Sequence, residues 1–179
     1  MKTYTERKRL GTEEVKDSFL GTFSTFDILS EDGGVAYKVR YGQYSHTLTN
    51  ANGDTLLTIP KALGLYGFAG RSTITDGAGK EVFKIKDSRA DLLHQIVGLL
   101  DTNNNLVCGL TPGKAPEADI DPNHKILDKI GTTFYNILDS GGRQIGNIEL
   151  KIAKLYGTVT FDETKINDEA ALALLILVY

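Results

Sequence analysis

Basic side chains recur at matching positions in two similar segments, and they are the residues of this sequence best suited to bind an anion. Lys38 and Arg40 follow one predicted turn, and Lys84 and Lys86 follow another at the same spacing. Residues two apart on a strand project from one face, so each pair is expected to point outward, opposite its apolar neighbours. Further cations lie near these strands: Arg7, Lys8, Arg9 and Arg71. If sheet closure gathers the strands, these residues form an anion-binding face; otherwise they form an ordinary solvated strand face, where lysine discourages edge pairing.

No other residues are spaced for catalysis or for holding a metal or cofactor. The histidines are His46, His94 and His124, and a metal site would need these distant residues to converge with carboxylates. Neither the G-x-S-x-G elbow of hydrolases nor the G-x-x-x-x-G-K-[ST] phosphate loop occurs. The glycine-rich segment 64–72 fits no phosphate-binding fingerprint and is interpreted as a turn. The sequence therefore predicts a protein that is not an enzyme and has no cofactor.

The composition indicates a soluble intracellular protein. The single cysteine, Cys108, excludes an intramolecular disulfide, and its apolar neighbours indicate a buried thiol. The first residues are polar and lack the apolar run of a secretory signal, and no stretch reaches the about 18 apolar residues of a membrane span. The net charge of −3 disfavours general nucleic-acid binding. We expect a cytoplasmic monomer with one domain over residues 1–179, peripheral at a membrane if it contacts one.

Five similar segments supply the strands that would position the basic pairs. They begin at Phe26, His46, Ser72, Val97 and Tyr135. The fifth residue of each is Ser, Asn or Asp, and the eighth is Gly or Asn. Side chains of the first kind bond the backbone two residues on, and Gly or Asn accepts the positive φ of a hairpin turn. With apolar residues alternating on both sides, each segment is predicted to form a β-hairpin.

The interval between hairpins is irregular, which disfavours a solenoid or a propeller and favours a closed barrel or a sandwich. The longest interval, residues 110–131, holds three of the four prolines and is interpreted mostly as an excursion at the rim. Segment 87–97 is compatible with a helical turn or with a strand entry.

The last residues break the pattern, because none from Ala170 to Val178 is polar. Asn167 or Asp168 is a suitable N-cap, and Glu169 suits the positive end of a helix dipole. A helix of about 11 residues would be about 17 Å long, too short for a ~30 Å hydrocarbon core. A helix that is apolar on all sides must be buried, so we expect it inside the barrel. A buried β-strand is the alternative.

Two parts of the chain carry a resemblance to a known family. One is the hairpin segments within residues 22–86, including "STFDILSEDGGVAYKVR" and "STITDGAGKEVFKIK", and the other is the ending "YGTVTFDETKINDEAALALLILVY" within 132–179. The chain resembles the LURP-one-related proteins of the tubby C-terminal-like superfamily, which also includes phospholipid scramblases. The resemblance implies an antiparallel barrel of about twelve strands around a C-terminal helix, without a catalytic centre. Scramblases carry an acidic calcium-binding segment before that helix. Lys154 and Leu155 stand there in this chain, so the resemblance does not extend to calcium binding.

Two functions are consistent with these observations. Tubby relatives bind membrane phosphoinositides, so the first is recognition of anionic phospholipid headgroups by the basic residues. Plant LURP-one relatives are linked to pathogen defence, and the second is a defence- or stress-related scaffold that binds an unidentified protein through loops such as 111–131.

Overall fold

The computed structural model describes residues 1–8, 15–17, 21–61, 72–87, 97–114, 132–151 and 156–178. Within them, thirteen strands form one antiparallel sheet, and one helix follows. The elements are β1 (Lys2–Lys8), β2 (Val15–Asp17), β3 (Gly21–Leu29), β4 (Val35–Tyr41), β5 (Ser45–Asn50), β6 (Thr55–Pro60), β7 (Thr73–Thr75), β8 (Glu81–Asp87), β9 (Val97–Leu100), β10 (Leu106–Pro112), β11 (Thr132–Leu138), β12 (Gln144–Lys151), β13 (Tyr156–Phe161) and α1 (Asp168–Val178).

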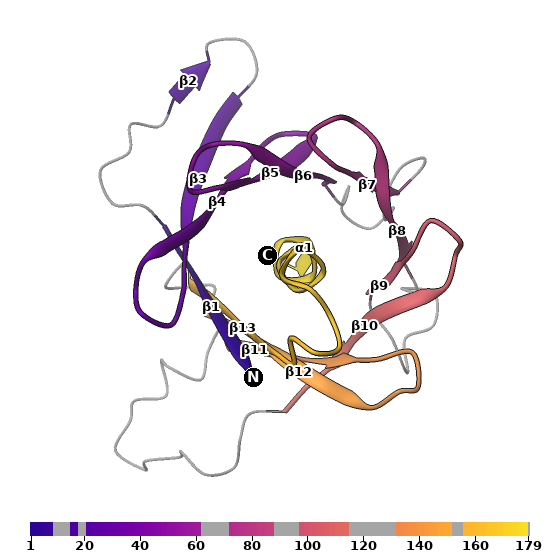
Figure 1. The fold of residues 1–179 in the computed structure, drawn as a ribbon. Coiled ribbons are helices and arrows are strands. Elements are labelled where there is room, and N and C mark those ends of the chain that lie inside the picture. The colour runs from indigo at the N-terminus through magenta and orange to yellow at the C-terminus, as the bar shows by residue number, and fades with distance from the viewer. Residues whose placement is uncertain are drawn as a thin grey trace, which may run out of the picture.

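The sheet closes into a barrel because β1 pairs with strands from both ends of the chain. Tyr4 of β1 lies opposite Val159 of β13, and Glu6 lies opposite Ile28 of β3. Twelve strands, β1 and β3–β13, therefore make the ring seen in Figure 1. Strand β2 stands outside this ring, paired with the first residues of β3. A closed ring leaves its strands without free edges, and the predicted barrel is confirmed.

All five predicted hairpins form, and their turns have the same backbone hydrogen bonds. In the β7–β8 turn the Asp76 N–H donates to the Lys80 carbonyl and the Gly79 N–H donates to the Asp76 carbonyl, at 2.8 and 3.0 Å. The Asp76 Oδ1 also accepts from the N–H groups of Ala78 and Lys80, both at 2.9 Å. The backbone bonds recur in the other four turns. The eighth residue of each segment has positive φ: Gly33, Gly53, Gly79, Asn104 and Gly142. The turn chemistry read from the repeat is confirmed in four turns, whereas the Ser30 hydroxyl donates to the Gly34 carbonyl at 3.0 Å instead of accepting from the backbone two residues on.

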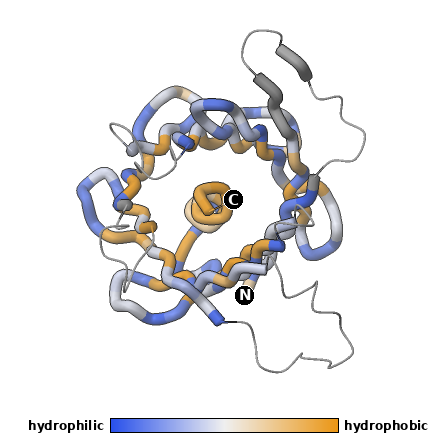
Figure 2. Tube along the Cα trace, turned by 180° about the vertical axis from the view of Figure 1, so that it is seen from behind, coloured by the Kyte–Doolittle hydropathy of each residue, from blue (hydrophilic) through white to orange (hydrophobic). Residues whose placement is uncertain are grey.

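The terminal segment is a helix that lies inside the ring (Figure 1). Its residues from Ala170 to Ile176 are all buried. They pack among the inward side chains of the strands in one apolar core. Figure 2, which colours the Cα trace by hydropathy, shows the helix as a hydrophobic segment inside the ring. Fully buried wall residues include Ile28, Leu48, Leu57, Ile74, Leu99, Cys108, Leu110, Ile137 and Val159. The helix is confirmed over the strand alternative, and the buried Cys108 is confirmed as well.

The helix begins with a side-chain cap. The Asn167 Oδ1 accepts from the Ala170 N–H at 2.9 Å, so Asn167 is the N-cap of the two residues proposed. Three other expectations fall largely outside the described residues: the rim excursion at 110–131, whose first residues belong to β10, the segment 87–97 and the turn at 64–72.

Substitutions at the turns should separate backbone strain from packing. Gly79 has a φ of 81°, and no atom lies within 4 Å of where its Cβ would be. We therefore expect Gly79→Val to lower the free energy of unfolding by about 1 kcal/mol or more through backbone strain alone. Asn104 has the same conformation, so Asn104→Gly should be neutral or stabilising. Urea denaturation of both variants measures this. Equal effects of the two substitutions would contradict the assignment.

Candidate functional site

The outer wall of the barrel carries the predicted cations in two groups. Lys38 and Arg40 lie on β4, with Arg40 exposed and Lys38 half-buried, while Lys84 and Lys86 lie on β8. Strands β5, β6 and β7 separate the two pairs in the sheet. At about 4.8 Å a strand, this is about 19 Å along the wall. Within each pair the alternation with buried Val39 or Ile85 keeps both members on the outer face, as the sequence predicted.

Barrel closure brings Arg7 beside the β4 pair. Arg7 of β1 lies opposite Asp27 of β3, which in turn lies opposite Lys38. Arg40 lies two residues further along β4 and is exposed, as is Arg7. We call Arg7, Lys38 and Arg40 the β4 cation group. With three cations and the one carboxylate of Asp27 between them, this part of the wall has a local charge of 3 − 1 = +2, against −3 for the chain.

The β8 pair has a different environment. Lys84 Nζ donates to the Thr102 carbonyl at 3.1 Å and to the Asn104 Oδ1 at 2.7 Å. Its ammonium also lies 3.6 Å from the Glu81 carboxylate. Lys84 is therefore held against the β9–β10 turn, while Lys86 is exposed. Of the other predicted cations, Lys8 ends β1, but its side chain, Arg9 and Arg71 lie outside the described residues.

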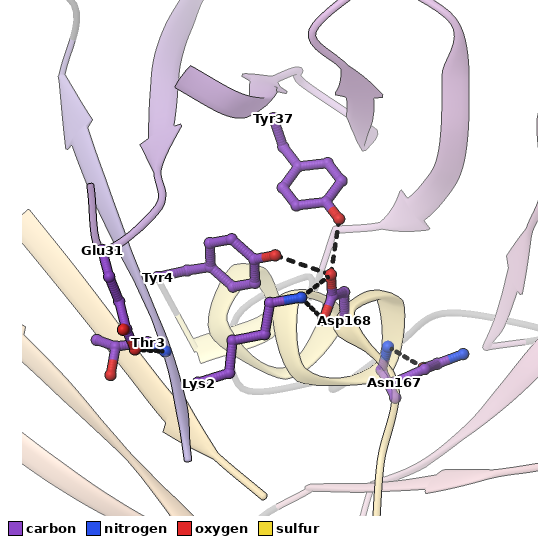
Figure 3. A network of polar contacts seen from close by, with 8 residues as sticks. Lys2, Thr3, Tyr4, Glu31, Tyr37, Asn167 and Asp168 are labelled. Carbon is purple, nitrogen blue, oxygen red and sulfur yellow. Dashed lines mark hydrogen bonds and ion pairs between the residues drawn. The ribbon is translucent and has the colours of Figure 1, made fainter. Parts of the chain in front are cut away.

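A second group of polar side chains holds the start of the helix to the barrel wall (Figure 3). The Asp168 carboxylate accepts from Lys2 Nζ with both oxygens, at 2.9 and 2.8 Å. Its Oδ2 also accepts from the hydroxyls of Tyr4 and Tyr37, each at 2.8 Å. Burial alone would raise the pKa of Asp168, but the hydrogen bonds from Lys2 and the two tyrosines outweigh it and hold the pKa below its usual value. The same burial and the carboxylate raise the pKa of Tyr4 to about 12.

Sequence reasoning proposed Asp168 only as a helix cap and did not find its partners. Lys2 is 166 residues away and Tyr37 is 131 residues away. No spacing rule connects such residues. The arrangement is an anchor: it satisfies a half-buried carboxylate and fixes the first helical turn against β1 and β4.

Removal of the Asp168 charge should weaken the anchor in a pH-dependent way. We expect Asp168→Asn to lower the free energy of unfolding at pH 7 by roughly 1–3 kcal/mol, because its partners lose an ionised acceptor. Since the folded-state pKa is depressed, the native carboxylate stabilises the fold above its ordinary pKa of 3.8 and loses this effect as the pH falls through the folded value. The variant and the wild type should therefore converge in acid. Chemical denaturation at several pH values, with exposed Glu163→Gln as the control, measures this; a constant difference would contradict it.

A third polar group lies inside the ring, beside the last turns of the helix. Glu6 is fully buried, and its Oε1 accepts from the Tyr41 hydroxyl at 2.6 Å. Its Oε2 has no hydrogen-bond partner among the described residues. Gly157 lies opposite Glu6 in the sheet and leaves room for it. A Cβ there would stand 3.0 Å from the Leu175 Cδ1 and 3.5 Å from the Glu6 Oε2.

Burial decides the charge of this group. It raises the pKa of Glu6 to about 7, although the hydrogen bond from Tyr41 acts to lower it. His46, edge-on to the Tyr41 ring at 4.8 Å, is also buried, and burial lowers its pKa to about 4. His46 is therefore uncharged at neutral pH, and Glu6 is mostly protonated below about pH 7. The strand alternation of Tyr4 and Glu6 was the available sequence signal, because it places Glu6 on the inward face.

The pH dependence of Glu6 can be isolated by substitution. A raised folded-state pKa means that the fold loses stability as the pH rises from about 4.5 to about 7, by about 3 kcal/mol in total. Gln keeps the shape without the charge, so we expect Glu6→Gln to become more stable than the wild type across this interval. The contribution of His46 to the free energy of unfolding has the opposite pH dependence, since its stabilising effect is lost as the pH falls from 6.5 towards 4. This contribution is common to both proteins and cancels in their difference. Urea denaturation between pH 5 and 8 tests this, and a pH-independent difference would refute it.

The described residues hold no group of three or more His, Cys, Asp or Glu side chains that could bind a metal ion. In the same part of the chain, no helix has the length and apolar character to cross a membrane. Comparison with protein-family models, with curated proteins and with solved structures finds no match for this chain.

Proposed function

We propose that this chain is a non-enzymatic, tubby-like binding module that attaches to anionic phospholipid headgroups, phosphoinositides among them, at the cytosolic membrane surface. The observation that carries the proposal is the β4 cation group, in which Arg7 of β1 and Lys38 and Arg40 of β4 lie on the outer face on either side of β3 and its Asp27. Arginine forks suit phosphate oxygens, and the paired strands hold the cations in a fixed arrangement.

The filled interior supports the proposal that a ligand binds at the outer surface of the barrel. The wall side chains that point inward, such as Leu48 and Ile148, have no solvent exposure, and neither does Leu174 of the helix between them. A ligand would therefore meet the outer wall or the turns. Each well-placed cation contributes about 1 kcal/mol near an anionic surface, so three give weak, reversible attachment. Such attachment weakens as salt shortens the screening length from about 10 Å at 0.1 M to about 3 Å at 1 M.

The separation of the two basic pairs provides a matched test. We expect Lys38→Gln with Arg40→Gln to weaken binding to phosphatidylcholine vesicles containing phosphatidylinositol bisphosphate by about thirtyfold, from two cations at about 1 kcal/mol each. Lys84→Gln with Lys86→Gln removes the same charge from another part of the wall, three strands away and beside the Glu81 carboxylate, and should change binding much less. Vesicle co-sedimentation at low and high salt measures both.

Two results would overturn the proposal. One is wild-type protein that does not bind anionic vesicles at low salt, which would favour the protein-binding scaffold instead. The other is an equal loss of binding in the two double variants, which would indicate attraction by total charge and not by the β4 cation group. Vesicles with phosphatidylserine alone, at equal charge, distinguish a phosphoinositide from any anionic surface.

A further inference from the structure

A second surface feature lies on a different part of the ring, over β10 to β13 (Figure 1). Two cavities, of about 440 and 350 Å³, open on the outer wall. Both are lined by Gln144 and Asn147 of β12, so they adjoin along this strand. Together they form a groove, which we call the amide groove.

Side-chain amides stand at the centre of the amide groove. Asn136 of β11 and Asn147 of β12 lie directly opposite each other in the sheet. Thr111 and Thr160 extend this row on the neighbouring strands. Neither asparagine side chain has a hydrogen-bond partner within the part of the chain that the structure describes, and Asn147 is exposed. Four amide donors and two carbonyl acceptors are thus available at one place on a rigid sheet.

The margins of the groove supply apolar surface and charged groups of both signs. Phe134 and Pro112 line the larger cavity beside Lys114. Asp162 lines the smaller cavity, and its Oδ1 already accepts from the Thr164 N–H and hydroxyl. Among the lining side chains, one cation and one carboxylate offset each other, and Met1, whose amino group acts electrostatically on Asp162, also lines the smaller cavity.

We propose that the amide groove binds a neutral saccharide. Sugar hydroxyls both donate and accept, so they pair with amides that can do the same, and the C–H face of a pyranose ring packs on an aromatic and proline surface. A peptide that adds a strand is disfavoured, because β10–β13 are each paired on both sides and offer no free edge.

The amide hydrogens provide a direct readout. Titration of the ¹⁵N-labelled full chain with cellohexaose, laminarihexaose, chitohexaose and maltohexaose should give saturable shifts of the Asn136 and Asn147 side-chain NH₂ signals with at least one sugar. The Asn52 and Asn103 signals should not shift, because these residues lie in exposed turns outside the groove. This measurement needs no variant and depends only on the native fold.

Paired variants then test the assignment. Asn136→Ala with Asn147→Ala should raise the dissociation constant at least about tenfold. Asn52→Ala with Asn103→Ala removes the same groups elsewhere and should leave the dissociation constant unchanged. The proposal is overturned by the absence of saturable shifts with all four sugars, by equal binding in the two double variants, or by groove shifts with an extended peptide and none with sugars. The vesicle test concerns other residues, so the two proposals fail independently.

Discussion

The structure depends on one constraint: a helix without a polar face must be shielded from water on every side. Seven consecutive residues of α1 are buried. Each Å² of apolar surface removed from water stabilises the fold by about 25 cal/mol. An α-helix with its side chains is about 10 Å across. A ring of twelve strands encloses such a helix, and the helix fills a ring that would otherwise be hollow. Neither the helix nor the ring can bury its apolar surface without the other.

Closure of this ring joins the two ends of the chain. Strand β1 must fit between β3 and β13, and it also carries two of the side chains that bind the start of the helix. Lys2 and Tyr4 bind the Asp168 carboxylate near the start of α1, whereas Leu175 near its end packs close to Gly157 of β13. The polar contacts of Asp168 orient the start of the helix in the barrel, which non-directional apolar packing alone specifies poorly. The absence of a side chain at Gly157 allows the close approach of Leu175 to the wall.

The filled interior leaves the outer wall and the turns as the surfaces that other molecules can reach. Outward strand positions contribute little to stability, so they can carry residues selected for contacts with other molecules. The β4 cation group and the amide groove use this freedom in different ways, with charge on one part of the wall and neutral hydrogen-bonding groups on another. Both rest on paired strands and not on the turns, which keeps their side chains in a fixed register.

Much of the architecture follows from local sequence. The Ser, Asn or Asp and the Gly or Asn of each turn set the backbone conformation within five residues, and the alternation of apolar side chains sets which face each strand buries. The terminal run from Ala170 to Val178 likewise required burial wherever it was placed. These features are readable because each is decided by a few adjacent residues and their φ and ψ angles.

The tertiary structure alone decided which of these elements are neighbours. It placed three strands between the two basic pairs, brought Arg7 to one of them, and joined Asp168 to partners 166 and 131 residues away. It also buried Glu6 opposite Gly157 and set Asn136 beside Asn147. The physical reason is that strand order, register and closure come from the collective enclosure of one helix. A short stretch of sequence predicts the face of the sheet to which a side chain points, but not which residue it contacts there.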